Sequence, residues 1–291
     1  MKILFPFELD NPLYTDCYVY AVKFARNLNA ELILLNVFDI ELDNNITKEK
    51  YNSLVKNNWL CAYNQITRFN KYYIEHHAKT DNDLKIRFDH RYVHGEWLSE
   101  IRKILKEETI DLVALPISED EKQNKKQFKI INDDIFERNN ASVLVVPQNC
   151  PFKPIGEIVY ATDLKKLNYN ELYIKDVLSY AKAFDSNIHF IHITKSETAF
   201  FPQSIDGYKT IMNAIKKNRK HVFKSFQGKN VIDAIEDYIL KSQAGLLVTI
   251  KHERFFLDTI FHKSISDELL LKSTIPVLVM REKDDLQDLK I

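Results

Sequence analysis

The sequence predicts an α/β protein made of two tandem copies of the same parallel sheet, each with helices on both faces. Two observations carry this prediction. Short apolar runs alternate with segments whose apolar residues recur at helical spacing, and this whole order occurs twice along 291 residues. Alternating strands and helices form parallel sheets, whose strands are covered on both faces and are therefore apolar throughout. An apolar fraction of 45% is enough for a sizeable core.

The first strand of each copy is a short run rich in β-branched and aromatic residues, followed by polar turn sequence. These runs are KILFPFEL at 2–9 and EIVYATDL at 157–164. The next segments, 24–39 and 180–195, align without a gap. In each of them a helix ends in a polar pair and a second strand begins, so both copies start with a strand–helix–strand unit.

The least regular part of the first copy, 43–85, is polar but predicts a long amphipathic helix. Its apolar residues recur at helical spacing: Tyr51, Leu54, Trp59, Tyr63, Ile66, Phe69 and Tyr73. The second copy is shorter here, and its counterpart is 205–218.

The two copies correspond again from His94 and from Gln227. Gly95 aligns with Gly228. In each copy a strand ends at this glycine, an amphipathic helix follows, and another apolar strand emerges. Each copy therefore predicts five strands alternating with four helices.

A final apolar strand closes each copy, SVLVV at 142–146 and PVLVM at 276–280. Between the copies lies a run with two prolines and a glycine, which is typical of a boundary. The expected organisation is a first domain at 1–147, a linker at 148–156, a second domain at 157–283 and a charged tail at 284–291.

Charge, cysteine and glycine content exclude several classes of function. Lys plus Arg and Asp plus Glu both number 41, so electrostatics give no reason to expect nucleic acid or a membrane surface as a partner. The three cysteines show no CxxC spacing, which predicts a reducing, cytoplasmic location. The first residues do not read as a signal peptide, and no apolar run approaches the roughly 20 residues of a membrane span. The five glycines lie too far apart for a GxGxxG motif or a P-loop.

Metal ligands and catalytic residues form no recognisable pattern, so we expect neither a metal nor enzymatic activity. His76 and His77 are neighbours on the expected long helix and point about 100° apart. His90 and His94 share one face of an expected strand but lie about 13 Å apart, too far to share an ion. The sequence also lacks the G-x-S-x-G motif of a hydrolase nucleophile.

Three segments resemble the universal stress protein family: a first strand that ends in ATD, the second strand IHFIHI, and a last strand PVLVM after a helix. The resemblance covers both copies and implies a five-stranded parallel sheet in each, with strand order 3-2-1-4-5 and a nucleotide site where the order reverses. It also implies that the last strands are apolar edges that pair antiparallel, so 142–146 and 276–280 would join the halves as a pseudo-dimer. A further homodimer through other faces is compatible with this arrangement.

ATP-binding members of that family carry a Gly-x2-Gly-x9-Gly-Ser/Thr motif after strand four and an aspartate at the end of strand one. In the second copy the aspartate position holds Asp163 and the hydroxyl position holds Ser264. The three glycine positions hold Ile250, Glu253 and Lys263. The spacing of the motif is intact, but every glycine is replaced.

The first copy departs further from the motif. Glu8 stands at the aspartate position and Ile130 at the hydroxyl position, and the glycine positions hold Pro116, Glu119 and Lys129. Glycines let a backbone approach phosphates closely and offer their N–H groups. A proline removes a donor, and a glutamate brings negative charge. We therefore expect no ATP binding of the family type in the first copy, and the replacements argue against it in the second.

A residual nucleotide or ligand cleft in the second copy is the candidate site. Its residues would be Thr162, Asp163, Lys251, Lys263 and Ser264. Asp163 could hold a ribose hydroxyl or could cap the following helix. The lysines and the serine could hold a phosphate.

The sequence thus favours a non-catalytic stress-response or signalling protein that needs no cofactor and acts through an unknown protein partner or a small ligand. Two alternatives stay open. One is a nucleotide-dependent switch or weak ATPase that takes an adenine nucleotide at Asp163 and Ser264. The other is a binder of a small apolar or lipid-like metabolite beside Phe255 and Phe256.

Overall fold

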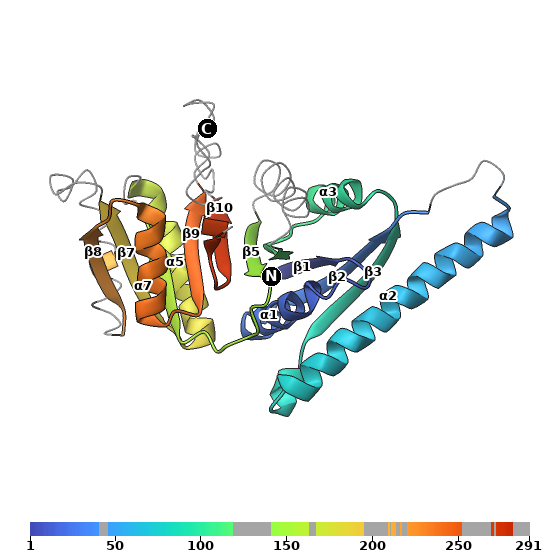
Figure 1. Ribbon diagram of the computed structural model, residues 1–291, viewed down its shortest axis with the longest axis horizontal. Coiled ribbons are helices and arrows are strands. Elements are labelled where there is room, and N and C mark those ends of the chain that lie inside the picture. Colours follow the sequence, from blue (N-terminus) through green and yellow to red (C-terminus); the bar gives the residue numbers. More distant parts are fainter. Residues whose placement is uncertain are drawn as a thin grey trace, which may run out of the picture. The chain divides into compact units, whose positions relative to one another are not determined.

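The computed structural model divides into two units, Met1–Phe152 and Lys153–Ile291. In both units, strands alternate with helices (Figure 1). The residues that the structure describes are 1–40, 46–118, 141–162, 167–194, 209, 211–213, 216, 220–251, 269–270 and 272–281.

The strands of unit 1 form a parallel sheet in the order β3-β2-β1-β4-β5. Their bounds are β1 Lys2–Phe7, β2 Glu31–Phe38, β3 Arg87–His94, β4 Leu112–Ile117 and β5 Ser142–Pro147. The order reverses between β1 and β4, so the predicted doubly wound α/β class is confirmed. β1 and β4 are almost wholly buried, as strands covered on both faces must be.

The helices of unit 1 cover both faces of this sheet. In Figure 1, α1 (Tyr14–Asn27) and α2 (Lys48–His76) lie below the strands and α3 (Trp97–Glu107) lies above them. The side chain of Glu96 caps α3 by accepting hydrogen bonds from its first backbone N–H groups. A short 3-10 turn, η1 (Asp81–Leu84), follows α2.

α2 is the long helix expected within 43–85. Thr47 caps its first turn, with the hydroxyl oxygen accepting a hydrogen bond from the Lys50 N–H at 3.3 Å. The buried side chains of α2 all belong to its C-terminal half: Ala62, Gln65, Ile66, Phe69 and Tyr73. The helical spacing assigned Trp59 and Tyr63 to the same apolar face, but these side chains are 45% and 50% exposed. The reason is that they lie on a neighbouring flank of the helix, at the margin of its contact with the sheet, where Trp59 meets Tyr92 of β3 edge-on.

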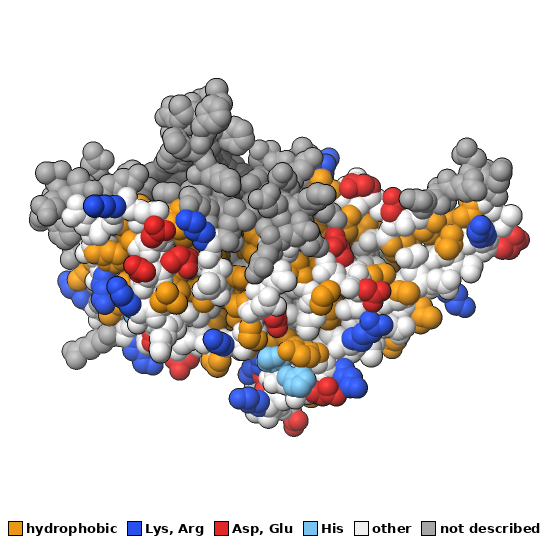
Figure 2. Space-filling view, in the orientation of Figure 1, with side chains coloured by type: hydrophobic (Ala, Val, Ile, Leu, Met, Phe, Trp, Pro, Cys, Tyr) orange, Lys and Arg blue, Asp and Glu red, His pale blue; other side chains and the backbone are white. Residues whose placement is uncertain are grey.

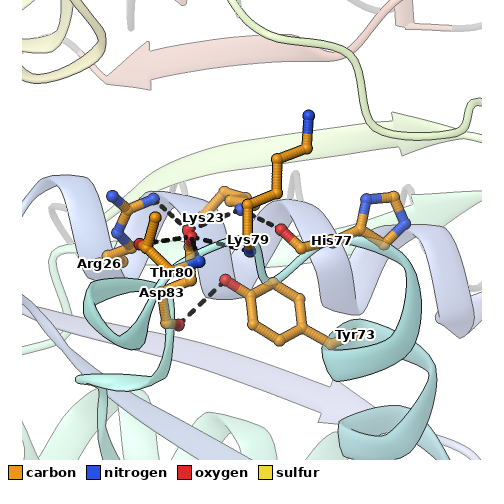
Figure 3. A network of polar contacts seen from close by, with 7 residues as sticks. All are labelled: Lys23, Arg26, Tyr73, His77, Lys79, Thr80 and Asp83. Atoms are coloured by element: carbon orange, nitrogen blue, oxygen red, sulfur yellow. Dashed lines mark hydrogen bonds and ion pairs between the residues drawn. The ribbon is translucent and has the colours of Figure 1, made fainter.

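A buried carboxylate ties the end of α2 to α1 (Figure 3). Asp83 is 4% exposed, and its side chain accepts hydrogen bonds from Lys23 Nζ at 3.0 Å and from Arg26 Nη1 at 2.5 Å. It also accepts from the backbone N–H groups of Lys79 and Thr80 and from the Thr80 hydroxyl. Burial raises the pKa of the Asp83 carboxyl, but these hydrogen bonds outweigh it and hold the pKa well below its ordinary value.

Unit 2 repeats this architecture with the order β10-β9-β6-β7-β8, again parallel in every described pair. Its strands are β6 Glu157–Ala161, β7 Asn187–Thr194, β8 Val222–Gln227, β9 Leu246–Lys251 and β10 Val277–Arg281. The helices include α5 (Leu167–Phe184) and α7 (Val231–Ser242), and the Asn230 side chain caps α7. Across the described residues of both units, none of the helices combines the length and the apolar character that crossing a bilayer requires.

The two units match in register as well as in strand order. Ile3 pairs with Leu112 across β1 and β4, and Ile158 pairs with Leu246 across β6 and β9. These are the residues that the alignment of the two copies places at equivalent positions. The internal duplication of the sequence is therefore also a repeat in the structure.

Candidate functional site

The strand order of unit 1 reverses between β1 and β4, the place where an open α/β sheet is expected to form a crevice. β1 pairs with β2 along its whole length, from Lys2 to Phe7. It pairs with β4 only at Ile3 with Leu112 and at Leu4 with Val113, among the residues described. The ladder between β1 and β4 therefore stops before the carboxyl-terminal residues of the two strands. In open α/β sheets, ligands bind at this place.

Two prolines flank the crevice of unit 1. Pro6 on β1 and Pro116 on β4 are both buried, and both lie beyond the last residue pair that the two strands share. Pro116 stands at the first glycine position of the family motif. Because proline has no backbone N–H, neither residue offers a donor to a ligand in the crevice. Glu8, which stands at the aspartate position, instead accepts a hydrogen bond from the side-chain amide of Asn11 at 3.2 Å.

Aromatic side chains fill the α1–α2 side of the sheet below this crevice. Phe5 and Phe7 of β1 pack with Phe69 of α2, with ring centroids 6.2 and 5.7 Å apart. Asn36, which is 1% exposed, donates a hydrogen bond from Nδ2 to the Phe7 carbonyl oxygen at 3.1 Å. Sequence reasoning missed Asn36, although a lone polar residue in the apolar run LILLNVF was a usable signal.

The crevice of unit 2 lies between β6 and β9. These strands pair at three positions, the last being Tyr160 with Val248. Thr162 follows β6, and its N–H donates to the Ile191 carbonyl oxygen at 3.0 Å. Ile250 stands at the first glycine position and is 9% exposed. A buried side chain thus occupies a position where the family motif has bare backbone.

The structure locates only part of the predicted cleft. Thr162 stands at the end of β6, and Lys251 is the last residue of β9, where it pairs with Arg281. Other residues singled out in the sequence lie outside the described residues, namely Asp163, Glu253, Phe255, Phe256, Lys263 and Ser264 of the second copy and Glu119, Lys129 and Ile130 of the first.

A second polar cluster lies at the amino end of the unit 2 sheet, away from the crevice. His189 Nε2 is 2.8 Å from a carboxylate oxygen of Glu157, and His189 Nδ1 is 2.8 Å from the hydroxyl of Tyr238 on α7. Asn187 Nδ2 donates to the other carboxylate oxygen at 2.6 Å. The histidine is held between a carboxylate and a phenol, which gives it a structural role. Its partners are 32 and 49 residues away, so the sequence did not reveal them.

Comparisons with known proteins identify the fold. No family model and no curated protein matches the chain. A universal stress protein from Archaeoglobus fulgidus DSM 4304 matches with a TM-score of 0.64 and 14% identity, over 97% of this chain and 98% of that one. A functionally unknown protein from Pseudomonas aeruginosa PAO1 matches with a TM-score of 0.60 and 14% identity, over 97% and 93%. The cytoplasmic domain of a prokaryotic cation chloride cotransporter matches with a TM-score of 0.55 and 11% identity, over 97% and 95%.

A doubly wound parallel sheet with a crevice at the reversal of strand order defines the class of open α/β folds. Within that class, the chain has the fold of the universal stress proteins along nearly its whole length. The predicted resemblance is confirmed at the level of the fold. Because the sequence identities are only 11–14%, these matches establish the fold alone.

Proposed function

We propose that this protein is a non-catalytic stress-response or signalling protein of the universal stress type that does not bind ATP in the way the family motif implies. The observation that carries the proposal is the position of Pro6 and Pro116. Both are buried on the strands that flank the crevice of unit 1, beyond their last shared pair. Ile250 takes the place of Pro116 in unit 2.

The physical reason lies in how phosphates are held at the carboxyl end of a strand. Backbone N–H groups must point at the phosphate and must be reached closely, which is why glycines serve there. Pro116 has no N–H, and Ile250 adds a branched side chain. In each copy a glutamate follows three residues later, at Glu119 and Glu253, and its negative charge opposes a triphosphate.

A nucleotide-dependent switch or weak ATPase in unit 2 is the second candidate function. The sequence retains Asp163 and Ser264, and the crevice between β6 and β9 supports a site there. The residues proposed to hold a nucleotide or another small ligand are Thr162, Asp163, Lys251, Lys263 and Ser264.

Thermal denaturation with and without ATP and Mg²⁺ tests the proposal that the protein does not bind ATP in the manner of the family motif. A ligand present at a hundred times its Kd would add about 2.7 kcal/mol to the free energy of unfolding, enough to raise the Tm by several degrees. We expect no change in Tm for the wild-type protein. A stabilisation by ATP that the substitution Asp163→Ala removes would show instead that unit 2 is a nucleotide site.

We further propose the domain boundaries predicted from the sequence: domains at 1–147 and 157–283, the linker 148–156 and the tail 284–291. We also propose a cytoplasmic location, which the free thiols of Cys17, Cys61 and Cys150 support.

The proposed pairing of the last strands, 142–146 and 276–280, makes a prediction for hydrogen exchange. β5 and β10 are each the end strand of their own unit's order. If the two edges pair, every backbone amide that they direct at each other should be protected, as in the central strands. Fast exchange at alternate residues of both strands would show open edges and would contradict the pairing.

A further inference from the structure

α2 carries a second apolar surface besides the one it packs on the sheet. The side chains of Trp59, Leu60 and Tyr63 are 45%, 48% and 50% exposed. Hydrophobic side chains are visible on the α2 part of the surface in Figure 2. Tryptophan and tyrosine are the residues most enriched at the energetic centres of protein interfaces.

This surface continues from the helix onto the outer strand of unit 1. The rings of Trp59 and Tyr63 stack with centroids 5.7 Å apart, and Tyr92 of β3 meets Trp59 edge-on at 5.8 Å. Phe88 lies four residues before Tyr92 on the same face of β3, about 13 Å away along the strand, and is 36% exposed. The aromatic face is the surface formed by Trp59, Leu60, Tyr63, Phe88 and Tyr92. The rings of Trp59, Tyr63 and Tyr92 support one another, so at these three residues a partner would meet a preformed surface.

The helix beneath the aromatic face is positively charged. Between Glu49 and Glu75 it carries no carboxylate, and its charged residues in that stretch are Lys50, Lys56, Arg68 and Lys71. Lys56 lies one turn before Trp59 and Leu60, on the same flank of the helix. Arg68 pairs with exposed Asp10 and Lys71 with Glu75, whereas Lys56 forms no ion pair with an acid among the described residues.

We propose that the aromatic face is a docking site for an acidic amphipathic helix of a partner protein. Trp59 and Tyr63 are four residues apart and form the ridge that a second helix packs against. Carboxylates flanking the partner's apolar stripe would meet Lys56, which gives the pairing its specificity. The inference rests on the proposed function through protein contacts and names the surface that makes them.

Charge also distinguishes an acidic helix from the two alternative occupants, a second copy of this chain and an anionic membrane. In a symmetric contact between two copies, α2 of the second copy would offer Lys56 no carboxylate, because the helix has none between Glu49 and Glu75. Recruitment to anionic lipid takes a cluster of about 4–8 basic residues at one surface, whereas the aromatic face has Lys56 alone beside its rings.

The test uses two synthetic 18-residue helical peptides with the same leucine stripe, one flanked by glutamate and the other by lysine. Binding is followed by anisotropy of a labelled peptide and by the emission of Trp59, with the full-length protein. We expect saturable binding of the acidic peptide, and about 10- to 30-fold weaker binding for Trp59→Ala and for Tyr63→Ala. Lys56→Glu should transfer the preference to the basic peptide. Leu240→Ala, a truncation of a 69% exposed side chain on α7, should change nothing.

Four outcomes would overturn the proposal. They are no saturable binding of the acidic peptide, equal binding of both peptides by the wild-type protein, a dimer in sedimentation that Trp59→Ala dissociates, and binding to phosphatidylserine vesicles that Trp59→Ala abolishes. The last two would assign the aromatic face to a second copy or to a membrane. ATP binding is measured separately, so a failure of the proposed function is distinguishable from a failure of this inference.

Discussion

Replacing Asp83 with alanine should lower the free energy of unfolding of unit 1 by about 3–5 kcal/mol. The substitution leaves two cations without their counter-charge, Lys23 with a side chain 10% exposed and Arg26 with one 28% exposed. It also removes the acceptor that holds the turn after α2. Urea denaturation followed by tryptophan emission measures the effect in unit 1, because both tryptophans, Trp59 and Trp97, belong to that unit.

The matched control is Asp10→Asn, which removes the charge of an ion pair with Arg68 whose side chains are 66% and 80% exposed, and which suits the left-handed backbone at this position (φ 52°). We expect a loss of less than about 1 kcal/mol there. The pKa of Asp83 is lowered in the folded state, so its contribution is present at neutral pH and is lost as the pH falls through the folded value. The difference between wild type and Asp83→Ala should therefore persist at pH 5 and shrink below about pH 4. Equal effects of the two substitutions would refute this account of the network.

Phe69→Ala should destabilise unit 1 by a similar amount, about 3–5 kcal/mol. Phe69 is 2% exposed and packs against the rings of Tyr18, Phe7 and Phe5, with centroids 5.1, 5.7 and 6.2 Å away. Its removal leaves a cavity where the C-terminal half of α2 meets β1. The same denaturation experiment measures the loss.

Tyr63→Ala provides the comparison on the same helix, since Tyr63 is 50% exposed and its ring stacks on that of exposed Trp59. It should cost under about 1 kcal/mol. If Phe69→Ala prevents folding, Phe69→Leu should give a smaller and measurable loss, because leucine refills part of the cavity. Similar stabilities for the Phe69 and Tyr63 variants would mean that the aromatic cluster does not hold α2 in place.

The fold was predictable because the duplication doubled the signal. A strand buried on both faces is apolar at every position, and both copies repeat such strands in the same order. The alignment placed Ile3 on the equivalent of Ile158, and the structure pairs them with Leu112 and Leu246 in the same register. Two copies that show the same pattern are stronger evidence for the fold than one copy alone.

The details of α2 were harder to predict, for a physical reason. Its helical spacing predicted the helix but not which flank meets the sheet, so Trp59 was grouped with Phe69 on one apolar face although it is 45% exposed. The anchor at Asp83 depends on Lys23 and Arg26, which are 60 and 57 residues away in the sequence. No local pattern marks such a contact, because each residue by itself is typical of a solvated surface.

The candidate site was predictable in position and only partly in content. The reversal of strand order between β1 and β4 places a crevice wherever this topology occurs. The resemblance gave the replaced glycines, and the structure puts Pro116 and Ile250 on the strands that border the two crevices. The contribution of Pro6 became visible only from the pairing of β1 with β4, which stops two residues before it.

Calorimetric titration of the wild-type protein with ATP and Mg²⁺ tests the central claim most directly. The positive control is the variant Ile250→Gly/Glu253→Gly/Lys263→Gly, which restores the three glycines of the motif and keeps Asp163 and Ser264. We predict no binding heat for the wild-type protein at ATP concentrations up to the millimolar range. A saturable isotherm with a micromolar Kd that Asp163→Ala abolishes would contradict the claim and would make unit 2 a working nucleotide site.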